Sequence, residues 1–165
     1  MKIINITYDN QRNLFLLTLD TQETFFLSYS FYNEMDWHIG DSLKDQDRNF
    51  LQDEHSKNTC LQKALYFASY KSRSSQEVIH KLEKENFRSK DINQALESLK
   101  KMHLIDDKRY AINYAKEKSS FKHWSKRKIK IHLLQRGLDD YNIKQALNEI
   151  SEEKEVKSRI LCKIV

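Results

Sequence analysis

The chain of 165 residues contains no proline and only two glycines, Gly40 and Gly137. Because proline and glycine interrupt helices, their scarcity predicts long helices, and the 32% of charged residues predicts that these helices have polar outer faces. Two glycines also cannot build a glycine-rich phosphate-binding loop or a nucleophile elbow. The longest apolar runs are only a few residues, too short for a signal peptide or a membrane-spanning helix. We therefore expect a soluble, cytoplasmic protein that does not engage a membrane.

Residues that could support catalysis or hold a metal are scarce as well. The two cysteines form no C-x-x-C pair, and the six histidines have no H-x-x-x-H spacing. Asp106 and Asp107 could form a carboxylate pair, but both precede a helical run, where aspartate caps the helix and suits its dipole. We expect a non-enzymatic protein with no catalytic residue, no metal site and no cofactor.

The most informative feature present is an internal repeat of 51 residues, in which segment 73–99 aligns without a gap with segment 124–150. Paired apolar residues recur at three- and four-residue steps, which places one apolar stripe on each of two helices. The pairs are Val78/Ile129, Leu82/Leu133, Phe87/Leu138, Ile92/Ile143, Ala95/Ala146, Leu96/Leu147 and Leu99/Ile150.

Local signals mark the helix ends in each repeat. Ser74 and Glu77 have the S-x-x-E spacing of a capping box, worth about 1 kcal/mol at the start of a helix. Asn86 and Gly137 occupy the same repeat position, and both residue types tolerate the left-handed conformation of a helix C-cap. A third helix is expected to begin at Asp106. The repeating unit is thus three helices.

The cysteines follow the same period. Cys60, Ala111 and Cys162 are successively 51 residues apart, so they occupy one structural position that accepts a small apolar side chain. We expect both thiols to be buried and reduced, because a free cysteine packs as a small hydrophobe. A disulfide or a metal site is the alternative.

The first 43 residues differ from the repeats. Segments around Ile4–Tyr8, Leu14–Leu19 and Thr24–Tyr29 are rich in branched and aromatic residues and predict a three-stranded meander. Residues 30–37 predict a short helix, followed by a turn at Gly40. Such a small module has little core and an open sheet edge, so we expect it to lean on the helices or on a partner.

The predicted fold is therefore mostly α, with tandem three-helix repeats that are helix-turn-helix-like, preceded by a small three-stranded β module. Residues 44–57 are expected to form a charged, solvated linker helix. The predicted domains are a β module at 1–43, the linker helix at 44–57, repeat one at 58–105, repeat two at 106–150, and at 151–165 the start of an incomplete third repeat or a capping helix.

Charge is distributed unevenly. Residues 1–57 carry 5 Lys/Arg against 10 Asp/Glu, whereas residues 58–165 carry 24 against 14. The helical part is therefore basic and favours an anionic partner, either nucleic acid or an acidic protein surface. The densest basic stretch, interleaved with Phe121, His123 and Trp124, comprises Lys116, Lys118, Lys122, Lys126, Arg127, Lys128, Lys130 and Arg136. A solvated helix face and a partner-binding surface are both consistent with this pattern.

Residues 60–150 resemble the RecX family of recombinase regulators. The resemblance rests on the segment Ser72–Arg73–Ser74 leading to Leu82, on Leu104–Ile105–Asp106–Asp107 through Arg109–Tyr110–Ala111, and on Ile129, Leu133 and Arg136–Gly137–Leu138. The resemblance implies a non-enzymatic protein of homologous recombination, DNA repair and the SOS response. Such a protein binds the RecA filament and inhibits strand exchange and ATP hydrolysis.

Under that interpretation the cations of the 116–136 stretch would contact the filament, and Arg73 and Arg109 would mark the matching surface of repeat one. The protein is expected to be a monomer. A direct, largely sequence-nonspecific nucleic-acid-binding module is the alternative, since lysine serves phosphates better than base edges. A purely structural helical scaffold would explain the repeats but not the charge asymmetry.

Overall fold

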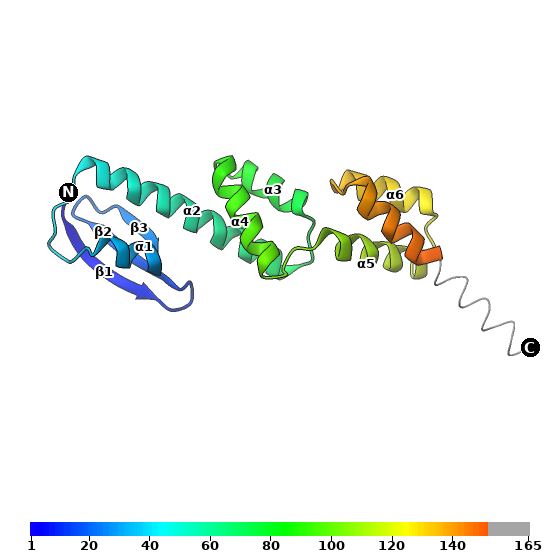
Figure 1. Ribbon diagram of the computed structural model, residues 1–165, viewed down its shortest axis with the longest axis horizontal. Coiled ribbons are helices and arrows are strands. Elements are labelled where there is room, and N and C mark those ends of the chain that lie inside the picture. The colour runs from blue at the N-terminus through cyan, green and yellow to red at the C-terminus, as the bar shows by residue number, and fades with distance from the viewer. Residues whose placement is uncertain (152–165) are drawn as a thin grey trace, which may run out of the picture. The chain divides into compact units, whose positions relative to one another are not determined.

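The computed structural model describes residues 1–151, and within them the chain is mostly helical with one three-stranded sheet (Figure 1). The predicted fold class is confirmed. The elements are β1 (Ile3–Asp9), β2 (Leu14–Leu19), β3 (Thr24–Ser28), α1 (Tyr29–Met35), α2 (Asp45–Tyr70), α3 (Ser75–Lys84), α4 (Ser89–Lys101), α5 (Asp107–Ser120), α6 (Lys126–Gln135) and a further helical segment at 140–151. Of the segment 151–165, expected to open a third repeat or to cap the second, residues 152–165, including Cys162, lie outside the described part of the chain.

The chain divides into two compact units. One comprises Met1–Tyr66 and Leu82–Ser98, and the other comprises Phe67–Lys81 and the chain from Leu99 onward. The basic stretch found in the sequence lies in the second unit.

The sheet is an antiparallel meander with strand order β1-β2-β3, as predicted. Leu17, Leu19 and Leu27 point into its core and are fully buried. A register shift between Ile3 and Asn5 changes the alternation of β1: buried Ile3 and half-buried Ile6, three residues apart, both contact the core, whereas Ile4 is 45% exposed.

The first half of α2 packs on the β module, and the prediction of a solvated linker helix at 44–57 is wrong. Leu51 is fully buried and belongs to the same apolar core as the sheet. His55 stacks on Phe26 and accepts the Phe26 backbone N–H at its Nδ1, at 3.0 Å. The reason is that a charged sequence average hides a narrow buried stripe on one helix face. The expectation that the β module leans on helices is confirmed.

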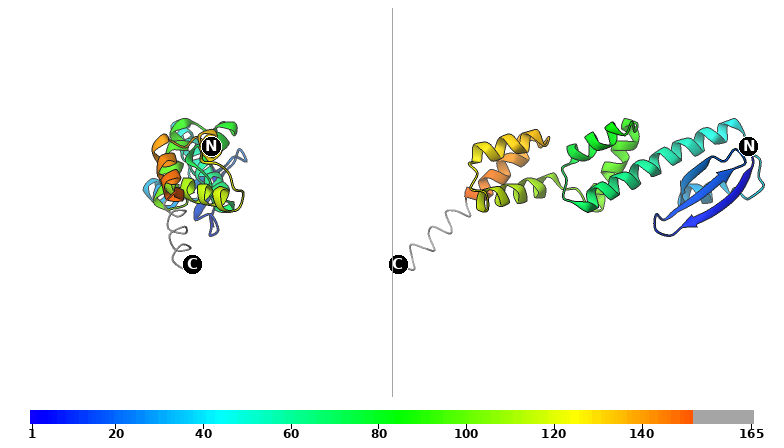
Figure 2. Two further views of the ribbon diagram at one scale, coloured as in Figure 1. Left: turned by 90° about the vertical axis from the view of Figure 1, so that its right-hand side faces the viewer. Right: turned by 180° about the vertical axis from the view of Figure 1, so that it is seen from behind.

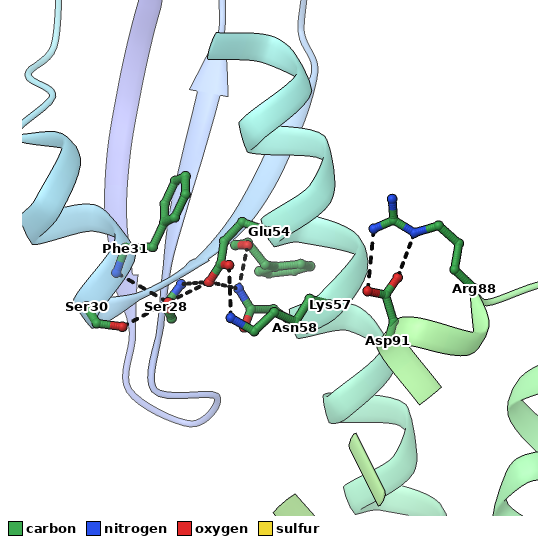
Figure 3. Close-up of polar contacts among 9 residues, drawn as sticks. Ser28, Ser30, Phe31, Glu54, Lys57, Asn58, Arg88 and Asp91 are labelled. Atoms are coloured by element: carbon green, nitrogen blue, oxygen red, sulfur yellow. Dashed lines mark hydrogen bonds and ion pairs between the residues drawn. The ribbon is translucent and has the colours of Figure 1, made fainter. Parts of the chain in front are cut away.

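A buried carboxylate joins α2 to the end of β3 (Figure 3). Glu54 Oε1 accepts hydrogen bonds from the Ser28 hydroxyl at 2.5 Å and from Asn58 Nδ2 at 3.0 Å. Burial opposes ionisation of Glu54, but the hydrogen bonds from Ser28 and Asn58 outweigh it and lower the pKa of Glu54 below 4.5. The bonds satisfy a charge that would otherwise be costly to bury.

The repeat predicted the helical core correctly. Both members of most aligned pairs are buried, including Val78 and Ile129, and Leu82 and Leu133. In the second unit, α5, α6 and the 140–151 segment lie side by side (Figure 2), and their apolar side chains form one core. It contains Tyr110, Ala111, Ala115, Ile129, Leu133, Leu138, Ile143, Ala146 and Ile150.

The predicted caps are also present. Ser74 N–H donates to the Glu77 carboxylate at 3.0 Å, and Glu77 N–H donates to Ser74 Oγ at 3.2 Å, which completes the capping box. Asn86 and Gly137 both have positive φ, 61° and 73°. These two helix ends close with the same backbone hydrogen bonds, shown for the second repeat by Leu138 N–H to Leu133 O at 3.2 Å.

The cysteine position is buried in both described repeats. Cys60 is a free thiol and is fully buried, as is Ala111. Burial, with the nearby Asp91 and Glu85 carboxylates, raises the pKa of Cys60 to about 11. The Cys60 thiol is therefore a packing group rather than a nucleophile or a ligand.

Candidate partner-binding surface

The candidate surface lies in the second unit, on and around α5. The two aspartates at the start of α5 accept backbone N–H groups. Asp106 Oδ1 accepts the Arg109 N–H at 2.9 Å, so Asp106 caps α5 as predicted. Asp107 Oδ1 accepts the N–H of Ser75, the first residue of α3, at 2.8 Å. The pair therefore serves helix ends and not acid–base chemistry.

The cations of residues 122–130 are exposed. Lys122 lies between α5 and α6, and Lys126, Arg127, Lys128 and Lys130 lie on the first turns of α6. The first turn of α6 contains no acidic residue. Cations near a helix N-terminus are unfavourable by a few tenths of a kcal/mol, up to about 1 kcal/mol. Ser125 caps the helix by accepting the Lys128 N–H at its Oγ, at 3.4 Å.

Several of these cations are held by neighbours. Lys126 Nζ donates to Ser151 Oγ, and Lys130 Nζ lies 3.5 Å from the Asp140 carboxylate. Lys128 Nζ lies 4.2 Å from the centroid of the Trp124 ring. The contacts restrict three long side chains and so reduce their conformational freedom.

Trp124 is the centre of an aromatic and cationic cluster. Its ring contacts the His132 ring at 4.6 Å between centroids, and Lys118 Nζ lies 5.8 Å from it on the α5 side. The sequence identified Trp124 only as a residue interleaved with the basic stretch. The structure shows that its ring lies near one cation of α5, Lys118, and one of α6, Lys128.

Arg136 lies apart from the exposed α6 cations and contacts α3 and α5. Its Nη1 donates to Glu77 Oε1 at 3.0 Å, and its guanidinium carbon lies 5.0 Å from the Tyr114 ring centroid. Burial disfavours the Arg136 cation, but Tyr110, Tyr114 and Glu77 outweigh burial and raise the pKa of Arg136. The guanidinium is therefore a permanent charge in a half-buried position.

Burial, followed by the nearby Glu77 charge, raises the pKa of Tyr110 to about 12. Tyr110 thus remains a neutral phenol at physiological pH. Its ring stacks with the Tyr114 ring at a centroid distance of 6.3 Å.

The second unit has a hollow of about 340 Å³, which is lined by eight residues. Five of them lie on one face of α5, at the three- and four-residue spacing that brings helical side chains together. The lining residues are Lys71, Ser72, Tyr110, Asn113, Tyr114, Glu117, Lys118 and Arg136.

The remaining predicted cations are dispersed. Lys116 pairs with Glu149 at 3.0 Å. Arg73 is half-buried, with its guanidinium carbon 4.1 Å from the Phe67 ring centroid. Arg109 is exposed on α5. The structure therefore brings Lys118 and Arg136 into one hollow and clusters residues 122–130, while Arg73, Arg109 and Lys116 lie outside the hollow.

Of the residues that line the hollow, sequence reasoning predicted only Lys118 and Arg136 as site residues. It missed Lys71, Ser72, Tyr110, Asn113, Tyr114 and Glu117. A signal for Asn113 existed in the helical spacing of residues 110, 113, 114, 117 and 118. The contribution of Lys71 and Ser72 comes from chain packing across about 40 positions of sequence and had no local signal.

Within residues 1–151, no group of three or more His, Cys, Asp or Glu side chains could hold a metal ion. In the same part of the chain, no helix is long and apolar enough to cross a membrane. The groups that line the hollow are cations, phenols, an amide, a hydroxyl and one carboxylate.

Comparison with known proteins assigns both repeats. The first three-helix domain of RecX matches residues 60–99, and the second three-helix domain of RecX matches residues 106–147. The chain belongs to the RecX family. RecX proteins are regulatory proteins and not enzymes.

Curated RecX relatives extend this similarity beyond the two domains. The regulatory protein RecX of Finegoldia magna is 29% identical over 150 residues, which cover 91% of this chain and 73% of the relative. The regulatory protein RecX of Lactococcus lactis is 32% identical over 153 residues, covering 90% of this chain and 52% of the relative. The chain thus spans between about half and three quarters of the length of these relatives.

Solved RecX structures have the same fold. A crystal structure of regulatory protein RecX superposes with a TM-score of 0.72 at 21% identity, covering 90% of this chain and 73% of that one. The crystal structure of RecX from Lactobacillus salivarius gives a TM-score of 0.58 at 26% identity, covering 62% of this chain and 66% of that one.

Proposed function

We propose that this RecX protein binds the filament of a RecA recombinase and inhibits its strand exchange and ATP hydrolysis. Family membership and the excess of basic residues after residue 57 support this function. A filament formed on DNA offers acidic protein surface and phosphates, both of which attract a basic surface. We further propose that the protein acts in the bacterial cytoplasm as a monomer.

The proposal rests on one observation: residues 122–130 present five exposed cations, one between α5 and α6 and four on the first turns of α6. These residues are Lys122, Lys126, Arg127, Lys128 and Lys130. Three of the side chains are restricted by Ser151, Trp124 and Asp140, so the charge is held in place before a partner arrives. Arg73 and Arg109 are secondary contacts in the proposal.

The test is DNA-dependent ATP hydrolysis by a RecA recombinase, measured with increasing amounts of this protein and repeated with excess single-stranded DNA. Inhibition below one protein per recombinase subunit that extra DNA does not relieve is the expected result. Loss of inhibition when DNA is added would mean that the protein only competes for DNA.

Charge reversal locates the surface. The triple variant Lys126→Glu, Arg127→Glu, Lys128→Glu should lose inhibition by about tenfold or more, because it turns attraction into repulsion. A matched triple variant at exposed lysines elsewhere, Lys44→Glu, Lys84→Glu and Lys144→Glu, changes net charge equally. Equal inhibition by the two triple variants would overturn the assignment of this surface.

A second candidate function is direct binding of single-stranded nucleic acid. It is favoured by Phe121, whose side chain is 80% exposed beside Lys122 at the end of α5. Exposed aromatic rings among cations are the usual platform for stacking bases. Affinity for free DNA that falls steeply with salt, without an effect on the recombinase, would favour this function.

A further inference from the structure

None of the exposed cations of residues 122–130 lines the hollow on the second unit. Of the hollow's eight lining residues, three are cations, Lys71, Lys118 and Arg136, and one is an anion, Glu117. The remaining lining groups are two phenols, one amide and one hydroxyl. The hollow therefore combines a net positive charge with neutral hydrogen-bonding groups.

Two of the three cations are already fixed. The Tyr114 ring has Lys118 Nζ at 5.1 Å and the Arg136 guanidinium carbon at 5.0 Å from its centroid. The Lys118 side chain is only 19% exposed, and Arg136 also bonds Glu77. A ligand thus meets cations whose conformational freedom is already reduced, which favours binding.

Glu117 shows the electrostatic character of this surface. The hydrogen bond and charge of Lys118, followed by the charges of Lys122 and Lys71, lower the pKa of Glu117. The Glu117 carboxylate therefore neutralises part of the positive charge that would attract an incoming anion. Its presence also repels a chain of successive phosphates.

The composition of the hollow favours a protein ligand over DNA. Tyrosine and arginine are the residues enriched where one partner inserts an anchoring side chain into a pocket of the other. Nucleic-acid backbones instead follow open rows of cations, such as residues 122–130. A recessed site with three cations and one carboxylate has enough excess positive charge for one acidic side chain, whereas a row of phosphates would also meet the carboxylate.

We propose that the hollow lined by Tyr110, Tyr114, Lys118 and Arg136 receives an acidic side chain, Asp or Glu, of the protein partner. This inference rests on the proposed function, since the partner is the recombinase filament. It assigns protein recognition to the hollow and leaves the exposed cations of residues 122–130 as a separate contact.

The test uses two substitutions in the hollow, each with a control in repeat one. Asn113→Asp adds a carboxylate to the lining, and Asn93→Asp makes the same change on α4. Both asparagines are exposed, and both lie four residues before a glutamate, Glu117 and Glu97, so each change adds the same i,i+4 pair of like charges to its helix. Glu117→Gln removes the competing carboxylate, and Glu97→Gln is its control.

The measurement is the dissociation constant of the full chain for RecA filaments on single-stranded DNA with a non-hydrolysable ATP analogue, and for the same DNA alone. Asn113→Asp should weaken filament binding about tenfold and leave DNA binding unchanged, whereas Asn93→Asp should bind like the wild type. Glu117→Gln should bind the filament more tightly than Glu97→Gln. A gain of affinity cannot arise from misfolding.

The possible failures are distinguishable. If Asn113→Asp binds the filament as tightly as Asn93→Asp, the hollow is not a contact, although the proposed function stands. If Asn113→Asp weakens binding to free DNA equally, the occupant is nucleic acid and the inference is wrong. If the wild-type protein does not bind the filament, the proposed function and this inference fail together.

Discussion

Gly137 lies against Gln76 so closely that no side chain fits between them. A Cβ atom on Gly137 would come within 2.4 Å of both Cβ and Cγ of Gln76. Gly137 follows α6, and Gln76 lies in the first turn of α3, the equivalent helix of the first repeat. The contact therefore joins two residues that are 61 positions apart in the sequence. The φ of Gly137 is also positive, at 73°.

Gly137→Ala is therefore expected to destabilise the protein by about 2–4 kcal/mol, from left-handed backbone strain and overpacking together. Gly40→Ala is the control, because Gly40 also has positive φ but no atom lies within 4 Å of its Cβ position. It should cost only about 1–2 kcal/mol. Urea denaturation of both variants measures the difference, and equal losses would contradict the close contact.

Ser74 and Ser125 occupy equivalent positions in the two repeats but make different hydrogen bonds. Both cap a helix, but Ser74 is buried and its hydroxyl also donates to the Arg136 carbonyl oxygen at 2.8 Å. Ser74→Ala should cost about 2–3 kcal/mol, because it removes a cap and leaves the Arg136 carbonyl oxygen without its part-buried donor. Ser125→Ala should cost about 1 kcal/mol. Thermal unfolding of the two variants tests this ranking.

Leu82 and Leu133 are the central buried leucines of the two repeats. Replacing either by alanine should lower the free energy of unfolding by about 2–5 kcal/mol, through lost burial and an unfilled cavity. Leu134→Ala is a suitable control, since Leu134 is 45% exposed on the same helix as Leu133. Losses below about 1 kcal/mol at both buried sites would contradict the repeat-based core.

His55 makes the stability of the β module depend on pH. Burial lowers the pKa of His55 below 6.5, because the neutral ring packs against Phe26 and accepts its N–H. The unfolded chain then binds more protons than the folded one just below pH 6.5, so stability falls as pH decreases from about 7 towards 5.

The urea midpoint of the wild-type protein should decrease over that interval. His55→Gln should have a flatter dependence, because glutamine does not titrate, although the variant is less stable at every pH. Identical pH slopes in the two proteins would rule out His55 as the source.

Much of the fold follows from local sequence. The 51-residue repeat placed Val78, Leu82, Ile129 and Leu133 in the core, because helical periodicity depends only on nearby residues. Caps at Ser74 and Asp106 were equally predictable, since a capping side chain bonds the backbone two or three residues away. The solvated linker helix was wrong because average charge carries no information on which single face is covered.

The candidate site also has one feature that the sequence predicts and another that only the tertiary structure shows. The sequence alone identified its charge: the excess of Lys and Arg after residue 57 and the dense run from Lys116 to Arg136 are properties of composition. Tertiary structure alone decided which cations lie together. Lys118 and Arg136 both contact the Tyr114 ring. Lys71, which precedes Tyr114 by 43 residues in the sequence, lines the same hollow, because folding brings distant segments to one surface. Spacing along a helix specifies a face, whereas a binding hollow requires the neighbouring segment that closes it.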